Sequence, residues 1–203
     1  MKLYQSIGPN PRVVKIFIAE KGLDVPRVEV DLMKGENRQP PHVARNPSGQ
    51  TPCLELDDGR YLAEITAICE YLEEKHPSPP LIGATAEERA ETRMWTRRVD
   101  LKICEPMANG FRFSEGLGLF KDRLLCIPEN APGLKAMAKD GETWLESQLK
   151  GPWICGDRFT LADILLFAFI EFGGTVGQPL GPGFKKLSQW FERVKARPAV
   201  AAA

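Results

Sequence analysis

The chain has 203 residues, and its 27 lysines and arginines balance its 27 aspartates and glutamates, so the formal net charge is zero. This balance argues against nucleic acid or an anionic membrane as a partner. The longest apolar run, residues 164–170, is far too short to span a bilayer. The start of the chain has no signal-peptide pattern, and the five cysteines are never spaced C-x-x-C. We therefore expect a cytoplasmic protein with reduced thiols and no metal site.

The first 76 residues alternate strand-like and helix-like patterns. In chain order we expect a strand at 2–5, a helix with Asn10 as its N-cap, a half-buried strand at 27–32, a strand at 53–56, a hairpin turn at 57–59 with a short strand after it, and a helix opening at Glu64. A strand, a helix and a strand within about thirty residues predict a right-handed parallel crossover. We therefore expect this half to hold a mixed four-stranded sheet with helices on it.

Residues 77–84 form a proline-rich segment that predicts a stiff linker, and the rest of the chain, 85–203, is helical in pattern. Thr85 and Glu88 have the spacing of a capping box at the start of a long helix. Pro106 is expected either to kink this helix or to end it.

The later helices follow from their apolar spacing. A helix at 134–149 is expected to turn Met137 inward. Thr160 and Asp163 have the spacing of a second capping box. The helix behind it, 164–172, has almost no polar face and is expected to be the buried centre of this half. A last amphipathic helix is expected to stop near Pro198.

Three sequence motifs stand out: NPSGQTPCLELDDG at 46–59, AEITAICEYLEE at 63–74 and GDRFTLADI at 156–164. Their order resembles the cytosolic glutathione S-transferase family. The segments GLGLFKDR and VGQPL are similar to a fungal and bacterial subgroup of that family. The resemblance implies an α/β plus all-α fold, with a thioredoxin-like, glutathione-binding domain over 1–76. An α-helical bundle over 85–203 would contribute the site for an electrophile. It also implies a homodimer.

The resemblance assigns the glutathione-binding residues. Thr51 and Pro52 match the residue pair whose backbone, before a cis-proline, pairs with the cysteinyl part of glutathione; the alternative is a plain strand entry. Glu64 matches an acid that contacts the γ-glutamyl amine, or else it is an ordinary acid at a helix start. Ile65 stands where the commoner pattern has Ser, so one hydrogen bond to a carboxylate is missing. Arg38 lies in the loop where many members bind the glycine carboxylate.

The group that activates the glutathione thiol is less well defined. The family places a Tyr, Ser or Cys between the first strand and the first helix, where this chain offers the polar side chains Ser6 and Asn10, and Arg12 nearby. Ser6 could equally be a turn residue, and Asn10 a cap. Arg12 and the positive helix end could lower the pKa of the thiol without a general base. The similar subgroup lacks a conventional Ser, Cys or Tyr, and polar side chains of its helical domain orient a water instead. Candidates for that arrangement are Asn109, Arg112 and Ser114.

The resemblance implies a transferase that adds glutathione, its co-substrate, to an electrophilic and apolar small molecule. Phe111 and Phe113 could line the pocket for this second substrate, although aromatic residues at such positions are more often core. Two alternatives stay open. One is a glutathione-dependent peroxidase or disulfide reductase, and the other is a binding protein of this fold without turnover.

Overall fold

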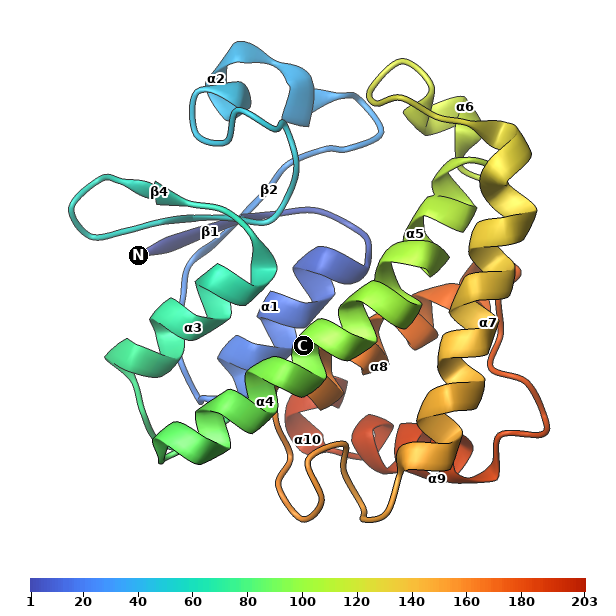
Figure 1. Cartoon of the computed structure of the whole chain (residues 1–203). Helices are drawn as coiled ribbons and strands as arrows, with labels where there is room; N and C mark the ends of the chain where they lie inside the picture. Colours follow the sequence, from blue (N-terminus) through green and yellow to red (C-terminus); the bar gives the residue numbers. More distant parts are fainter. The chain divides into compact units, whose positions relative to one another are not determined.

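The computed structural model describes residues 1–203 (Figure 1). The chain divides into two compact units. The first unit comprises Met1–Leu81 together with Pro198–Ala203, and the second comprises Ile82–Arg197. The short C-terminal helix α10 (Pro198–Ala202) thus belongs to the first unit, where it packs against helix α1 (Pro9–Glu20) and buries Val200.

The sheet of the first unit has four strands in the order β2-β1-β3-β4. The strands are β1 (Lys2–Gln5), β2 (Arg27–Glu29), β3 (Cys53–Glu55) and β4 (Tyr61–Leu62). The pair β1–β2 is parallel, and the pairs β1–β3 and β3–β4 are antiparallel. The predicted mixed four-stranded sheet is confirmed.

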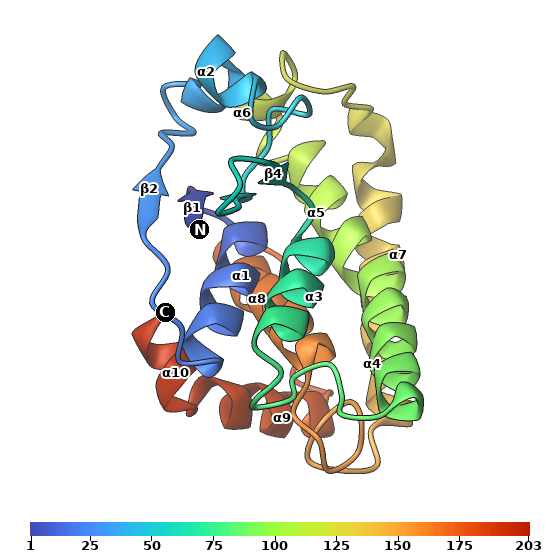
Figure 2. The same cartoon turned by 90° about the vertical axis from the view of Figure 1, so that its left-hand side faces the viewer.

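The two faces of this sheet are buried by different parts of the chain. Successive side chains of a strand point to opposite faces. Leu3 and Leu54 are paired across β1 and β3 and are fully buried, whereas Tyr4 and Cys53 lie on the other face. Helix α1 packs beside α3 (Ile65–Lys75) (Figure 2). On the Tyr4 face lies the segment that follows the short helices η1 (Glu36–Arg38) and α2 (Pro40–Val43). In this segment, the Arg45 guanidinium lies 4.3 Å from the centre of the Tyr4 ring.

Two local predictions for this unit were wrong. Helix α1 begins at Pro9, with Gly8 as its N-cap at φ 112°, so Asn10 lies inside the first turn. A φ of this size suits glycine, which has no Cβ to collide with the backbone. The strand expected at 27–32 is shorter, and all three residues of β2 are exposed because it is an edge strand. Only Val30, just beyond its end, reaches the core.

The second unit is entirely helical apart from isolated bridges and loops. Its helices are α4 (Ala86–Val99), a π-helical turn (Asp100–Cys104), α5 (Glu105–Arg112), α6 (Leu117–Phe120), a 3₁₀ turn (Pro128–Asn130), α7 (Ala131–Gln148), α8 (Leu161–Thr175) and α9 (Lys185–Lys195). Pro106 lies in the first turn of α5, directly after the π-helical turn, so the rod α4–α5 continues through it. A π-turn changes the hydrogen-bond register and thereby accommodates the missing proline N–H.

Helix α8 is the buried centre of the second unit, as the sequence predicted. All ten residues from Leu161 to Ile170 are buried, and α8 packs against α4, α5 and α9. The predicted capping box is present at its start, where Thr160 is the N-cap and Asp163 the N3 residue. The inward orientation expected for Met137 was wrong: its side chain is 58% exposed on the outer face of α7.

Candidate functional site

The hairpin β3–β4 brings the two best glutathione candidates of the first unit together. Its register pairs Leu54 with Leu62. Extending that register by two residues puts Pro52, before β3, level with Glu64, after β4. Pro52 is buried, and the Thr51–Pro52 peptide bond is cis. Thr51 precedes the first residue of the β3 ladder, so its backbone lies outside the hydrogen-bonded part of the sheet.

Glu64 has an unusual backbone. It is the only non-glycine residue with positive φ, at φ 68° and ψ 120°, and it is the N-cap of α3. Such conformations are sparsely populated and concentrate at functional sites. The Glu64 side chain is exposed, and its carbonyl accepts the first helical hydrogen bond, from Ile68 at 2.9 Å. The N–H groups of Ile65 to Ala67 thus have no partner within the helix, and the first turn contains no acid. This end of α3 therefore suits a carboxylate.

Arg38 lies in the loop before β3 but is directed back onto the chain. Its guanidinium donates a hydrogen bond to the Ser48 carbonyl at 3.2 Å. It also packs against Gly49, since a Cβ added to Gly49 would lie 3.0 Å from Nη1 of Arg38. The side chain is partly buried rather than extended into solvent. Arg38 therefore supports the loop that leads to Thr51.

The first-helix candidates are spread around the start of α1. Ser6 is buried, with 5% of its surface exposed. Pro9 and Pro11 have no N–H, so Asn10 supplies the only amide N–H among the first three helical positions. The Arg12 guanidinium donates to the Val200 carbonyl of α10 at 3.1 Å. It is thus tied to the C-terminal helix of the same unit.

Tyr4 does not have the properties of a thiol-activating tyrosine. Its hydroxyl donates to the Glu55 carboxylate at 2.7 Å, and this hydrogen bond, together with burial, raises the pKa of Tyr4. Cys53 next to it is not a reactive thiol either, because burial raises its pKa to about 11. Neither residue is poised to supply an anion at neutral pH.

The helical-domain candidates belong to α5 and the turn after it. Asn109 accepts a hydrogen bond from Arg112 at 2.8 Å, so these two side chains form one polar pair. Ser114 donates to the Gly110 carbonyl and lies against the Glu115 carboxylate. The structure therefore joins Asn109 to Arg112 and leaves Ser114 in a separate set of contacts.

The aromatic candidates differ in their surroundings. Phe111 packs edge-on against Phe120 at 6.1 Å and Phe172 at 5.1 Å between ring centres. Edge-to-face contacts of this kind are favourable between aromatic rings, and all three side chains are partly buried. Phe113, at the C-cap of α5, is partly buried.

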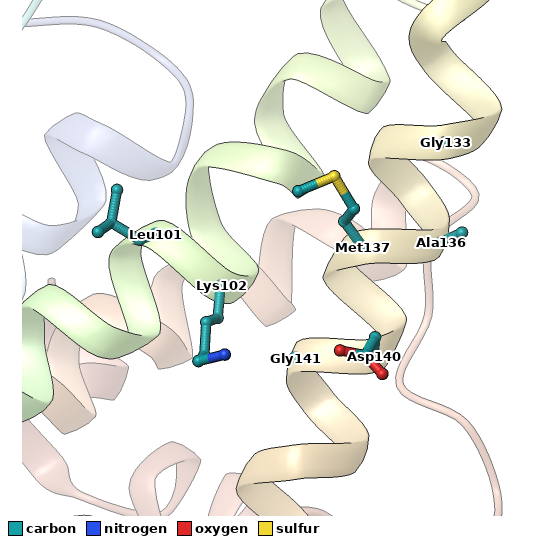
Figure 3. A pocket seen from close by; sticks show the side chains of 7 residues that line it. All are labelled: Leu101, Lys102, Gly133, Ala136, Met137, Asp140 and Gly141. Atoms are coloured by element: carbon teal, nitrogen blue, oxygen red, sulfur yellow. The ribbon is translucent and has the colours of Figure 1, made fainter.

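A shallow pocket of about 350 Å³ opens on the outer face of the second unit, between the π-helical turn and α7 (Figure 3). Leu101 and Met137 border it with exposed apolar side chains, and Lys102 and Asp140 border it with charged ones. The remaining lining residues are small: Gly133, Ala136 and Gly141. Gly141 lets the two helices approach, since an added Cβ would collide with the Lys102 carbonyl.

Sequence reasoning missed the polar side chains that support the glutathione candidates. Asn37, His42 and Asn46 are all buried in the segment before β3 and donate to its backbone. The available signal was Asn46-Pro47-Ser48-Gly49, because an asparagine before such a turn commonly bonds its backbone. His42 offered no comparable signal.

No group of three or more His, Cys, Asp and Glu side chains is arranged to hold a metal ion. No helix combines the length and the apolar character that a bilayer crossing requires.

Both halves of the chain match family descriptions. The glutathione S-transferase N-terminal domain matches residues 7–75, and the glutathione S-transferase C-terminal domain matches residues 126–198.

Individual relatives cover nearly the whole chain. Glutathione S-transferase 2 of Saccharomyces cerevisiae is 33% identical over 201 residues, which cover 95% of this chain and 84% of the relative. The crystal structure of Gtt2 from Saccharomyces cerevisiae has a TM-score of 0.92 at 33% identity, covering 100% of this chain and 99% of that chain. FtsZ-localized protein A of Caulobacter vibrioides is 32% identical over 202 residues, covering 95% of this chain and 85% of the relative. With both domains matched and 33% identity to a transferase along 95% of its length, this chain belongs to the glutathione S-transferase family.

Proposed function

We propose that the protein binds glutathione as a co-substrate and adds its thiolate to an electrophilic, apolar small molecule. The carbon–sulfur bond forms as the leaving group departs with its electron pair, and the thiol proton passes to solvent or to a nearby base. Residues 1–76 would form the glutathione-binding domain, and residues 85–203 would contribute the electrophile site. The observation that carries the proposal is the β3–β4 register, which brings Pro52 level with Glu64 at the start of α3 when it is extended by two residues.

Each part of glutathione has a candidate partner in the first unit. The Thr51 backbone would pair with the cysteinyl part, and the Glu64 carboxylate would contact the γ-glutamyl amine. The first turn of α3, beginning at Ile65, would hold the γ-glutamyl carboxylate through N–H groups that lack helical partners. Arg38 would attract the glycine carboxylate by its charge while it holds the Ser48 carbonyl.

For thiol activation we propose electrostatic stabilisation near the start of α1. Arg12 supplies a positive charge and Asn10 an amide N–H, and a thiolate is favoured by both. Ser6 is the candidate hydroxyl in the same stretch, with Asn109, Arg112 and Ser114 of the second unit as alternatives. Ser6→Ala tests the assignment: a loss of kcat of about tenfold or less favours electrostatics, and a loss of about a hundredfold or more assigns Ser6 an acid–base role.

Retention on immobilised glutathione, combined with turnover of a panel of aromatic halides and other alkyl or aryl electrophiles, tests the proposed reaction. We expect both. Retention without turnover of any electrophile would contradict the enzyme and favour a binding protein, a role suggested by Ile65 in place of the commoner Ser and by the lack of a conventional thiol-activating group. Turnover of hydroperoxides alone would favour glutathione-dependent reduction.

Two substitutions at the α3 start test the binding site by calorimetric titration with glutathione. Glu64→Ala should weaken binding about tenfold or more, since a hydrogen bond to a charged group contributes about 1.5–3 kcal/mol. Glu74→Ala, an exposed change near the other end of the same helix, is the matched control. Ile65→Ser should tighten binding by about tenfold or more because it adds a hydroxyl donor for the carboxylate. Unchanged affinity in Glu64→Ala would remove this residue from the site.

We also propose that the protein forms a homodimer through the outer face of α4, the π-helical turn and α7. Met94, Leu101 and Met137 are 42%, 50% and 58% exposed there. Light scattering should report a dimer for the parent protein and a monomer for Leu101→Glu. A monomeric parent protein at micromolar concentration would contradict this assignment.

A further inference from the structure

Three consecutive backbone carbonyls before Thr51 are each held by a side chain from the segment 37–46. The Ser48 carbonyl accepts from Arg38 at 3.2 Å, and the Gly49 carbonyl accepts from Asn37 at 2.6 Å. The Gln50 carbonyl lies 2.8 Å from Nε2 of His42 and accepts from Nδ2 of Asn46 at 2.9 Å. We call these four side chains, Asn37, Arg38, His42 and Asn46, the loop clasp.

Three of the four clasp side chains lie in the interior of the first unit, and Arg38 is partly buried. Asn37 and His42 are each 2% exposed, and Asn46 is 4% exposed. Buried polar side chains are costly unless they are hydrogen-bonded, so these residues favour one arrangement of the loop strongly. Asn46 forms hydrogen bonds through both ends of its side-chain amide. Its Nδ2 donates to the Gln50 carbonyl, and its Oδ1 accepts hydrogen bonds from the amide and the hydroxyl of Ser48 at 3.2 Å and 2.7 Å.

The Gln50 carbonyl differs from the other two because it has two donors. Gln50 C=O and Thr51 N–H belong to one trans peptide unit, which is planar. An imidazole from α2 and an amide from the segment after it meet the same oxygen, and together they fix the orientation of that plane. They therefore also fix the direction in which the Thr51 N–H points.

We propose that His42 and Asn46 are positioning residues that set the Thr51 backbone for its ligand through the Gln50 carbonyl. The inference rests on the proposed function, since it takes glutathione as the molecule that pairs with Thr51. The two residues touch the loop and act through Thr51. Their removal should therefore raise the dissociation constant of glutathione without lowering the share of folded protein.

Calorimetric titration with glutathione, well below the melting temperature of each variant, is the first test. His42→Ala and Asn46→Ala should each raise Kd about fivefold, which corresponds to one ordinary hydrogen bond. The double variant should exceed the product of the two effects, because each single variant still leaves the Gln50 carbonyl one donor. Gln39→Ala, an exposed change in the same segment, is the matched control and should leave Kd unchanged.

Two conservative variants separate positioning from general support of the turn. Asn46→Asp retains the acceptor for the Ser48 amide and hydroxyl but removes the donor to Gln50, so it should weaken binding as much as Asn46→Ala. His42→Gln retains a donor and should recover most of the affinity lost in His42→Ala. Normal affinity in Asn46→Asp would overturn the proposal.

A measurement without ligand distinguishes failure of this inference from failure of the proposed function. The ¹⁵N order parameter of Thr51 should be near about 0.85 in the parent protein and fall below about 0.6 in the double variant. If the parent protein does not bind glutathione, the proposed function fails, and the order parameter alone decides whether the clasp orients Thr51. An unchanged order parameter together with unchanged Kd in the double variant would refute it.

Discussion

Two buried polar clusters hold the backbone in this molecule, and they do so with opposite chemistry. In the second unit, the Asp163 carboxylate accepts hydrogen bonds of 2.8–2.9 Å from the backbone amides of Ile154 and Thr160 and from the indole N–H of Trp190. In the first unit the loop clasp donates to carbonyls. One cluster thus satisfies buried N–H groups, one of them at the start of a helix, and the other satisfies orphan C=O groups of an irregular loop.

Of all these contacts, only the one between Asp163 and Thr160 was visible in the sequence. The other two donors to Asp163, Ile154 and Trp190, lie 9 and 27 residues away and gave no such signal. Asp163 reaches Thr160 three residues away, a spacing fixed by helix geometry. The contacts of the clasp with carbonyls span 4 to 12 residues through a segment without regular repeat. Local patterns reveal contacts that secondary structure dictates, whereas contacts across a loop depend on how that loop folds.

The largest expected effect is the loss of the Asp163 carboxylate. Asp163→Ala should lower the free energy of unfolding by about 3–5 kcal/mol, because several buried donors lose their acceptor at once. Urea titration measures it, and Asp163→Asn, which retains one acceptor oxygen, should lose less. A loss below about 1 kcal/mol would show that the capping cluster contributes no more than a surface contact.

The pH dependence of stability tests the same carboxylate. Burial raises the pKa of Asp163 to about 6. The hydrogen bonds that the carboxylate accepts lower this pKa, but their effect is smaller than that of burial. A folded-state pKa above the unfolded value of about 3.9 means that the proton-linked stabilisation is complete below about pH 4 and is lost as pH rises through 6. Relative to Asp163→Asn, the unfolding free energy should fall by about 2–3 kcal/mol between pH 4 and pH 8. Parallel curves would mean that the donors keep the carboxylate ionised throughout.

Glu146 combines features of both clusters: it is a carboxylate acceptor, like Asp163, but its partners are distant in the sequence. From α7, its carboxylate accepts hydrogen bonds from the backbone amides of Lys186 and Leu187 at the start of α9, each at 2.9 Å. These two residues are about forty positions away in the sequence. Glu146→Gln should cost about 0.5–2 kcal/mol in urea unfolding. Equal stability of the variant and the parent protein would show that water replaces this cap without loss.

The smallest effect is expected for one member of the clasp. Asn37→Ala removes the donor to the Gly49 carbonyl and should lower the unfolding free energy by about 1 kcal/mol, the net value of a single hydrogen bond. Thermal unfolding beside the Gln39→Ala control measures it. A loss as large as that of Asp163→Ala would overturn the contrast between the two clusters.

Much of the fold could be predicted because it depends on periodic patterns. Alternation and the Asp57-Asp58-Gly59 turn indicated the hairpin β3–β4, and an unbroken apolar run indicated the buried helix α8. The failures were positions where tertiary context decided. Met137 is exposed because the outer face of α7 is not covered within its unit, and the residues of β2 are exposed because the strand lies at an edge.

The candidate site divides in the same way. Motif order indicated the family. Motif spacing and helix-start chemistry, which are local, predicted Thr51, Pro52 and Glu64 as contacts of glutathione. Only the folded chain shows the β3–β4 register, which brings Glu64 level with Pro52 when it is extended by two residues. Likewise, only the folded chain shows that Arg12 hydrogen-bonds the C-terminal helix and that Arg38 hydrogen-bonds the loop before Thr51. It also shows that His42 and Asn46 meet on one carbonyl. The physical reason is that a side chain hydrogen-bonds whichever backbone group the folded loop presents, and sequence spacing does not encode the path of an irregular loop.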